Sequence, residues 1–151
     1  VVLPPGAPPE FDEPVVHVPG CHLTFEVRHP APEVVPPPVL ASGRLTFGCF
    51  AQLYKLNAGV VQVFARILRQ CPGARLLLKA AALASEDQRA ALRASFAAQG
   101  VAADALQMEG PEEHRVFLEA YGRIDIALET FPYGGATTAT EALWQGVPVL
   151  A

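Results

Sequence analysis

The chain has 151 residues, of which 51% are hydrophobic and 17% are charged, and its formal net charge at pH 7 is −4. This length suits one domain, and the composition predicts a packed core rather than disorder. The 11 lysine and arginine residues form no basic stripe, so we expect no nucleic acid among the partners of the protein.

The cysteines and the apolar runs of the sequence indicate in which cellular compartment the protein is expected. Cys21, Cys49 and Cys71 are odd in number and widely spaced, which predicts neither a disulfide framework nor a zinc site. Free thiols are typical of a reducing compartment, and we expect a cytoplasmic protein. No apolar run approaches the ~20 residues of a membrane span, and no secretion signal is recognisable, so no membrane association is expected. The chain starts without methionine and stops inside an apolar run, which predicts a segment of a longer protein.

The first 43 residues differ in kind from the rest. Most of the 15 prolines lie between Pro4 and Pro38, which predicts an extended, irregular segment with at most short strands such as Leu23–Val27. One interpretation of residues 1–43 is a solvated linker. Against it stand apolar side chains suited to packing, namely Val15, Val16, Leu23, Phe25 and Val27.

From residue 44 onward, strand and helix patterns alternate. Short apolar runs rich in strand formers fall at 45–50, 75–79, 105–108, 124–128 and 147–150. Helical periodicity follows a cap at Asn57, and further helices are expected from Ser85 to Gly100, from a proline-led start at Pro111, and from Thr137 to Gln145. This alternation predicts an α/β fold over 44–151, a Rossmann-like parallel sheet doubly wound between two layers of helices.

In such a sheet, ligands bind beyond the carboxyl ends of the strands. The connection after the first strand carries Gln52 and Lys55, and a lysine there can pair with phosphate and stabilise a leaving group. An exposed surface lysine fits the same pattern.

The connection after the fourth strand contains Gly134, Gly135, Thr137 and Thr138 and runs into a helix. Glycines let the backbone approach an anion, and the amides and dipole of a helix N-terminus attract it. We therefore expect these residues to bind phosphate. The alternative is a tight turn with a threonine as an ordinary helix cap.

Two further residues fall at the same predicted edge. His114, in the first turn of a helix, is placed to stack on a base, and Glu141, one helical turn beyond Thr137, is placed to accept from ribose hydroxyls. A surface histidine and a solvated or salt-bridged glutamate are the alternatives.

These residues lie in longer motifs with a distinctive order: 47–57, 67–76, Glu113-His114, 125–138 and 141–149. From about Leu45 to its end, the chain resembles the catalytic region of the O-linked N-acetylglucosamine transferases, particularly the bacterial, tetratricopeptide-repeat-linked type. The resemblance implies that residues 44–151 are the nucleotide-sugar-binding half of a GT-B glycosyltransferase, truncated at its C-terminus, and that residues 1–43 are the tail of the preceding lobe.

The resemblance also implies a reaction. The donor would be UDP-N-acetylglucosamine and the acceptors serine or threonine hydroxyls of proteins, selected by a lobe and repeats outside this chain. Gln52 and Lys55 would contact the diphosphate, with Lys55 as the leaving-group stabiliser, and Thr137 and Thr138 would bind the pyrophosphate. His114 would pack against uracil, Glu141 would lie at the ribose, and the backbone of 108–110 would read the uracil edge. The resemblance implies a reaction without a metal or another cofactor, and the absence of an Asp-x-Asp motif agrees with this expectation.

Some positions depart from the family pattern. Ala136 stands where many members carry histidine or threonine, and Phe117 where some carry arginine. These departures keep open a non-catalytic nucleotide-binding or regulatory module of the same fold. A GT-B enzyme for small-molecule or lipid acceptors is a third alternative. In every case, one lobe alone is expected to be catalytically inactive.

Overall fold

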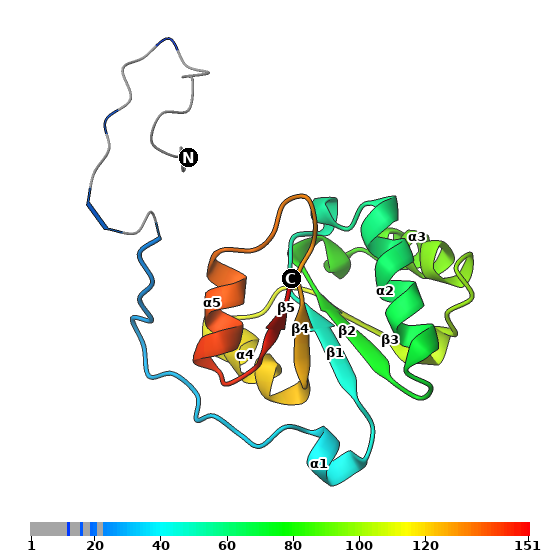
Figure 1. Ribbon diagram of the computed structural model, residues 1–151, viewed down its shortest axis with the longest axis horizontal. Coiled ribbons are helices and arrows are strands. Elements are labelled where there is room, and N and C mark those ends of the chain that lie inside the picture. Colours follow the sequence, from blue (N-terminus) through cyan, green and yellow to red (C-terminus); the bar gives the residue numbers. More distant parts are fainter. Residues whose placement is uncertain (1–11, 13–15, 17–18, 21–22) are drawn as a thin grey trace.

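The computed structural model describes residues 12, 16, 19–20 and 23–151. Its centre is one five-stranded sheet in the order β3-β2-β1-β4-β5 with every pairing parallel (Figure 1). The strands are β1 (Thr46–Cys49), β2 (Arg75–Lys79), β3 (Leu106–Glu109), β4 (Ile126–Leu128) and β5 (Val149–Leu150). The predicted parallel α/β fold is therefore confirmed.

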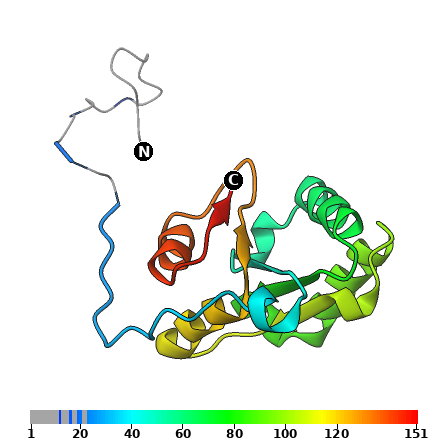
Figure 2. The ribbon, with the colours of Figure 1, turned by 60° about the horizontal axis from the view of Figure 1, so that its bottom comes forward.

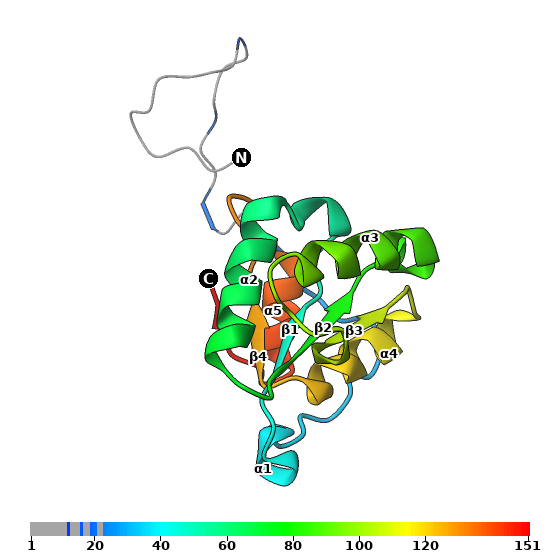
Figure 3. The same ribbon diagram turned by 90° about the vertical axis from the view of Figure 1, so that its right-hand side faces the viewer.

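Helices cover both faces of the sheet (Figures 1 and 3). On one side lie α2 (Ala58–Gln70) and α3 (Glu86–Ala97), and on the other α4 (His114–Glu119) and α5 (Thr137–Trp144). Side chains alternate between the faces along each strand. Leu76 and Leu78 thus join the buried cluster beneath α2 and α3, while Leu77 joins the cluster beneath α4 and α5.

Local signals explain where α2 begins and ends. The Asn57 side chain accepts from the Val60 amide at 3.0 Å, which confirms the predicted cap. Apolar side chains at helical spacing, including Phe64 and Leu68, then face the sheet. Gly73, with φ of 84°, turns the chain into β2.

The start of α4 was predicted too early. Pro111 does not open the helix, which begins at His114 after an extended Glu113. The intervening Glu112 carboxylate instead contacts Lys79, a cation that is 1% exposed. Because a buried charge requires a partner, this contact holds the connection just before α4 in place. Short 3₁₀ turns complete the connections: η1 (Leu53–Lys55), η2 (Ala81–Ala84), η3 (Ala103–Ala105) and η4 (Ala120–Arg123).

From residue 23 onward, the proline-rich segment runs along the side of the domain that carries α5 (Figures 1 and 2). Leu23–Val27 forms no strand, but Phe25 contacts the Trp144 ring, with centroids 5.8 Å apart, and Val27 packs against the cluster beneath α4 and α5. These two side chains thus contact the domain. Val16 is exposed, and Val15 and Cys21 lie outside the described residues.

The segment ends in α1 (Val39–Ser42), which is tied to the sheet by a buried carboxylate. Asp125 accepts from the amides of Val39 at 2.9 Å and Thr46 at 2.7 Å. Within the described part of the chain, no helix has the length and apolar character needed to cross a membrane.

Candidate functional site

The candidate site lies where the sheet changes its winding direction. After β1 the chain passes to the face covered by α2, and after β4 it passes to the face covered by α5, although the two strands are neighbours. Their outgoing connections therefore start from neighbouring strands toward opposite faces, and open α/β folds bind ligands at such a switch point of the carboxyl edge.

Two side chains join these connections. Lys55 donates from Nζ to the carbonyl oxygen of Gly134 at 2.8 Å, and Asn57 donates from Nδ2 to the carbonyl oxygen of Phe131 at 2.9 Å. Lys55 is half-buried, whereas Gln52 is exposed on the same connection. The structure thus brings Lys55 to the predicted glycine turn, whereas the exposed Gln52 forms no hydrogen bond with that turn among the described residues.

The glycine turn, residues 131–136, is held by hydrogen bonds with the two residues that precede it. The Gly135 amide donates to the Glu129 carboxylate, and the Thr130 hydroxyl donates to the Tyr133 carbonyl at 2.7 Å. A Cβ at Gly135 would collide with Thr138 Oγ1 and lie 3.1 Å from Glu129 Oε1. Gly135 has no positive φ, so glycine is required here for space rather than for backbone conformation.

The first turn of α5 presents unpaired donors. Its N-cap position is Ala136, which forms no side-chain cap, so the alternative of an ordinary threonine cap is wrong. Within residues 23–151, the amides of Thr137 and Thr138 have no protein acceptor. Unpaired amides at the positive end of a helix dipole form an arrangement that attracts anions.

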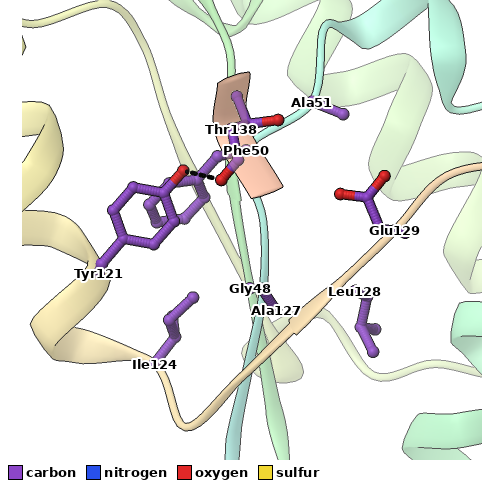
Figure 4. A pocket seen from close by; sticks show the side chains of 9 residues that line it. All are labelled: Gly48, Phe50, Ala51, Tyr121, Ile124, Ala127, Leu128, Glu129 and Thr138. Atoms are coloured by element: carbon purple, nitrogen blue, oxygen red, sulfur yellow. Dashed lines mark hydrogen bonds between the residues drawn. The ribbon is translucent and has the colours of Figure 1, made fainter. Parts of the chain in front are cut away.

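A small hollow lies directly beneath this turn (Figure 4). Tyr121 reaches across it and donates its hydroxyl to the Thr138 carbonyl at 2.9 Å, while Glu129 projects from the opposite wall. Cys49 lies nearby, but burial raises the pKa of its thiol to about 11, so it is not a nucleophile near neutral pH. The side chains of Tyr121 and Glu129 in this hollow thus support the first turn of α5 and the glycine turn.

His114 and Glu141 meet beside α5. His114 Nε2 is 2.9 Å from Glu141 Oε1, and Glu141 is only 5% exposed, so it is not a solvated glutamate. His114 keeps 45% of its side chain exposed. Its other ring nitrogen, Nδ1, lies 2.9 Å from Nε2 of His29 in the proline-rich segment.

An ion network holds the connection that leads to His114. Lys79 contacts the carboxylates of Glu109, at 3.3 Å, and Glu112, and Arg123 pairs with Glu109. The hydrogen bond from Arg123 is the main cause that lowers the pKa of Glu109. Among the described residues, no group of three histidine, cysteine, aspartate or glutamate side chains is arranged to hold a metal ion.

Sequence reasoning assigned no site role to Glu129, Tyr121 or His29. Glu129 lies within a motif used for the resemblance, but nothing in its local pattern shows that it binds a glycine amide six residues ahead. Tyr121 and His29 act across the fold, 17 and 85 residues from their partners. Contacts at such separations leave no periodic signal in a single sequence.

A parallel sheet in this order, with a glycine turn and unpaired helix amides at its switch point, defines an open α/β lobe of the Rossmann type. The chain belongs to glycosyl transferase family 41, whose family model matches residues 39–151. This membership confirms the resemblance drawn from the motifs.

Individual relatives agree. SPINDLY of Arabidopsis thaliana, named a probable UDP-N-acetylglucosamine–peptide N-acetylglucosaminyltransferase, is 35% identical over 156 residues, which cover 96% of this chain and 16% of that protein. SEC of Arabidopsis thaliana carries the same description and is 28% identical over 148 residues, covering 93% of this chain and 15% of that protein. A mutant O-GlcNAc transferase of Thermobaculum terrenum has a TM-score of 0.70 and 39% identity, covering 71% of this chain and 21% of that structure. The chain thus spans a small part of each relative.

Proposed function

We propose that this chain is the donor-binding lobe of a UDP-sugar-dependent glycosyltransferase that transfers N-acetylglucosamine to serine or threonine hydroxyls of proteins. The observation that carries the proposal is the convergence of Lys55 on the glycine turn at the start of α5. A cation and a set of unpaired amides at one point are suited to a diphosphate. The descriptions of the relatives support the sugar and the acceptor class.

Each residue has a distinct task in this proposal. The amides of Thr137 and Thr138 hold the diphosphate, with their hydroxyls and Gln52 as further donors, and Gly134 and Gly135 let it approach the backbone. As the acceptor hydroxyl attacks the anomeric carbon, negative charge builds on the departing UDP. Lys55 and the dipole of α5 stabilise that charge.

The nucleoside would lie toward the other end of α5. His114, with 45% of its side chain exposed, would pack against the uracil, and Glu141, whose Oε1 binds His114, would lie at the ribose. The backbone of 108–110 would meet the base edge. Lys55 and the helix amides supply positive charge at the diphosphate, and we propose a reaction that needs no metal.

The acceptor would be bound by a second lobe and by repeats outside this chain. We therefore propose that the 151-residue chain alone transfers no sugar. Cys49 and Cys71 are free thiols, which is in keeping with a reducing, cytoplasmic environment.

One observation favours a second candidate function. Ala136, at the N-cap of α5, places a methyl group where a polar side chain would reach the phosphates. The same lobe would then bind a nucleotide as a regulatory module without turnover.

Lys55→Ala in the intact enzyme separates the two functions. Because the ammonium acts on charge that develops in the transition state, we expect kcat to fall by about 10²-fold. Steady-state transfer to a protein acceptor measures this, with Arg66→Ala, an exposed cation of α2, as the matched control. A raised KM with unchanged kcat would show that Lys55 only binds. Absence of transfer from UDP-N-acetylglucosamine and from a panel of other UDP- and GDP-sugars would favour the regulatory module.

A further inference from the structure

Both ring nitrogens of His114 are engaged by side chains from different parts of the fold. Nε2 lies 2.9 Å from Glu141 Oε1 on α5, and Nδ1 lies 2.9 Å from His29 Nε2 on the proline-rich segment. The two imidazole planes are nearly perpendicular, at 81°, with the ring centroids 5.0 Å apart. His114 is therefore held through both of its ring nitrogens.

This arrangement limits what His114 can do. A general acid or base, or a metal ligand, needs a free ring nitrogen directed at its target. Here neither nitrogen is free, whereas 45% of the side chain remains exposed. The ring of Phe117 is stacked nearly parallel to that of His114, with the planes at 25° and the centroids 6.3 Å apart. What remains available on His114 is a flat face of fixed orientation.

The contacts form one continuous chain of side chains. It runs from the buried Glu141 carboxylate through His114 to His29, and His29 Nδ1 lies 3.3 Å from the carbonyl oxygen of Pro30. His29 is thereby held at both of its ring nitrogens as well.

His29 is itself positioned by the segment that carries it. Four residues earlier, Phe25 packs on Trp144 of α5, and Val27 packs against the cluster beneath α4 and α5. His29 lies outside the residues 39–151 that match the family model.

We propose that His29 is a positioning residue for base recognition: it fixes the ring plane and tautomer of His114, so that the proline-rich segment forms part of the nucleoside-binding side of the site. The ligand class is the planar base of a nucleoside diphosphate. The inference rests on the proposed function, since it assumes that a nucleotide binds at this edge.

Two variants of the 151-residue chain separate the hydrogen bond from the ring contact. His29→Phe keeps an aromatic edge but has no ring nitrogen, and His29→Gln keeps an amide that can donate to His114. Arg28→Gln, on the same segment with its side chain 86% exposed, is the control. Calorimetric titration with UDP and with inorganic pyrophosphate, which has no base, provides the binding readout.

We expect His29→Phe to weaken UDP binding about 5-fold, the scale of one lost hydrogen bond, and to leave pyrophosphate binding unchanged. His29→Gln and Arg28→Gln should bind UDP as the unaltered chain does. In ¹⁵N NMR spectra of the histidine side chains, the His114 ring signals should move in His29→Phe even without ligand.

Other results would overturn the inference. Equal losses for UDP and pyrophosphate would show a general structural role, and unchanged His114 ring signals would show that His29 does not set the ring. Unchanged UDP affinity in His29→Phe would reject the inference alone. If the unaltered chain bound neither UDP nor pyrophosphate, the proposed diphosphate site would fail with it.

Discussion

Lys79 illustrates how single charges are placed next to the candidate site. Lys79 is the last residue of β2 and is only 1% exposed. The cost of burying its ammonium group is offset by ion pairs with Glu109 and Glu112. Arg123 binds the same Glu109 from η4. These contacts hold residues 109–113, the connection that delivers His114, so the charge network contributes to the geometry of the site.

The network predicts a pH dependence of stability. Arg123 lowers the pKa of Glu109 below its ordinary value of 4.5, so the folded state favours the ionised carboxylate. This contribution is present above pH 4.5 and is lost as the pH falls through the lowered folded value. We expect Arg123→Met to lower Tm near pH 6. The difference in Tm between the variant and the unaltered chain should shrink toward pH 3.

Thermal unfolding followed by circular dichroism across this pH range measures this gap in Tm. Arg115→Met is the control, since Arg115 pairs with Glu119 on the surface at 3.3 Å. Exposed pairs contribute little, so its gap should be small throughout. A gap for Arg123→Met that stays constant from pH 6 to pH 3 would contradict the assignment.

At the scale of elements, the junction of β1 and β4 requires a glycine at position 48, because no space is left there for a side chain. Gly48 pairs with Ala127 of β4, and a Cβ there would lie 2.8 Å from Cγ2 of Ile124 and closer still to its Cδ1. Ile124 is 2% exposed and, together with Gly48, lines the small hollow beneath the first turn of α5. A Cβ at position 48 would therefore require the Ile124 side chain to shift.

Gly48→Ala should therefore destabilise the fold by about 1–3 kcal/mol, the usual cost of overpacking a core. Chemical denaturation measures the change. In an Ile124→Ala background, the same substitution should cost clearly less, because the colliding atoms are gone. If the losses in free energy of unfolding of the two single variants simply add in the double variant, the two positions do not interact.

The elements also show what the sequence could and could not predict. All five strands and the cap of α2 were predictable, because apolar runs and an asparagine before a periodic segment are local signals. The start of α4 was not, because Glu112 is drawn to Lys79, 33 residues away. The order of the strands was not predicted either, since it depends on which strands pair across the whole chain.

At the scale of the whole molecule, the candidate site draws on segments far apart in the sequence. Connections after β1, β3 and β4 supply Lys55, His114 and the glycine turn, and all were predictable because strands of a parallel sheet end at one edge. The proline-rich segment adds His29, which no local pattern indicated. Phe25 and Val27 of the same segment contact α5 and the cluster beneath α4 and α5.

The central claim is that the carboxyl edge of β1 and β4 binds a nucleoside diphosphate. The most direct test is a titration of the ¹⁵N-labelled chain with UDP, followed through backbone amide signals. We predict that Gly135, Thr137 and Thr138 shift most, with His114 also affected, while Arg44 and Gly73 at the opposite edge stay unchanged. Shifts centred on Arg44 and Gly73, or no shifts at millimolar UDP, would contradict the claim.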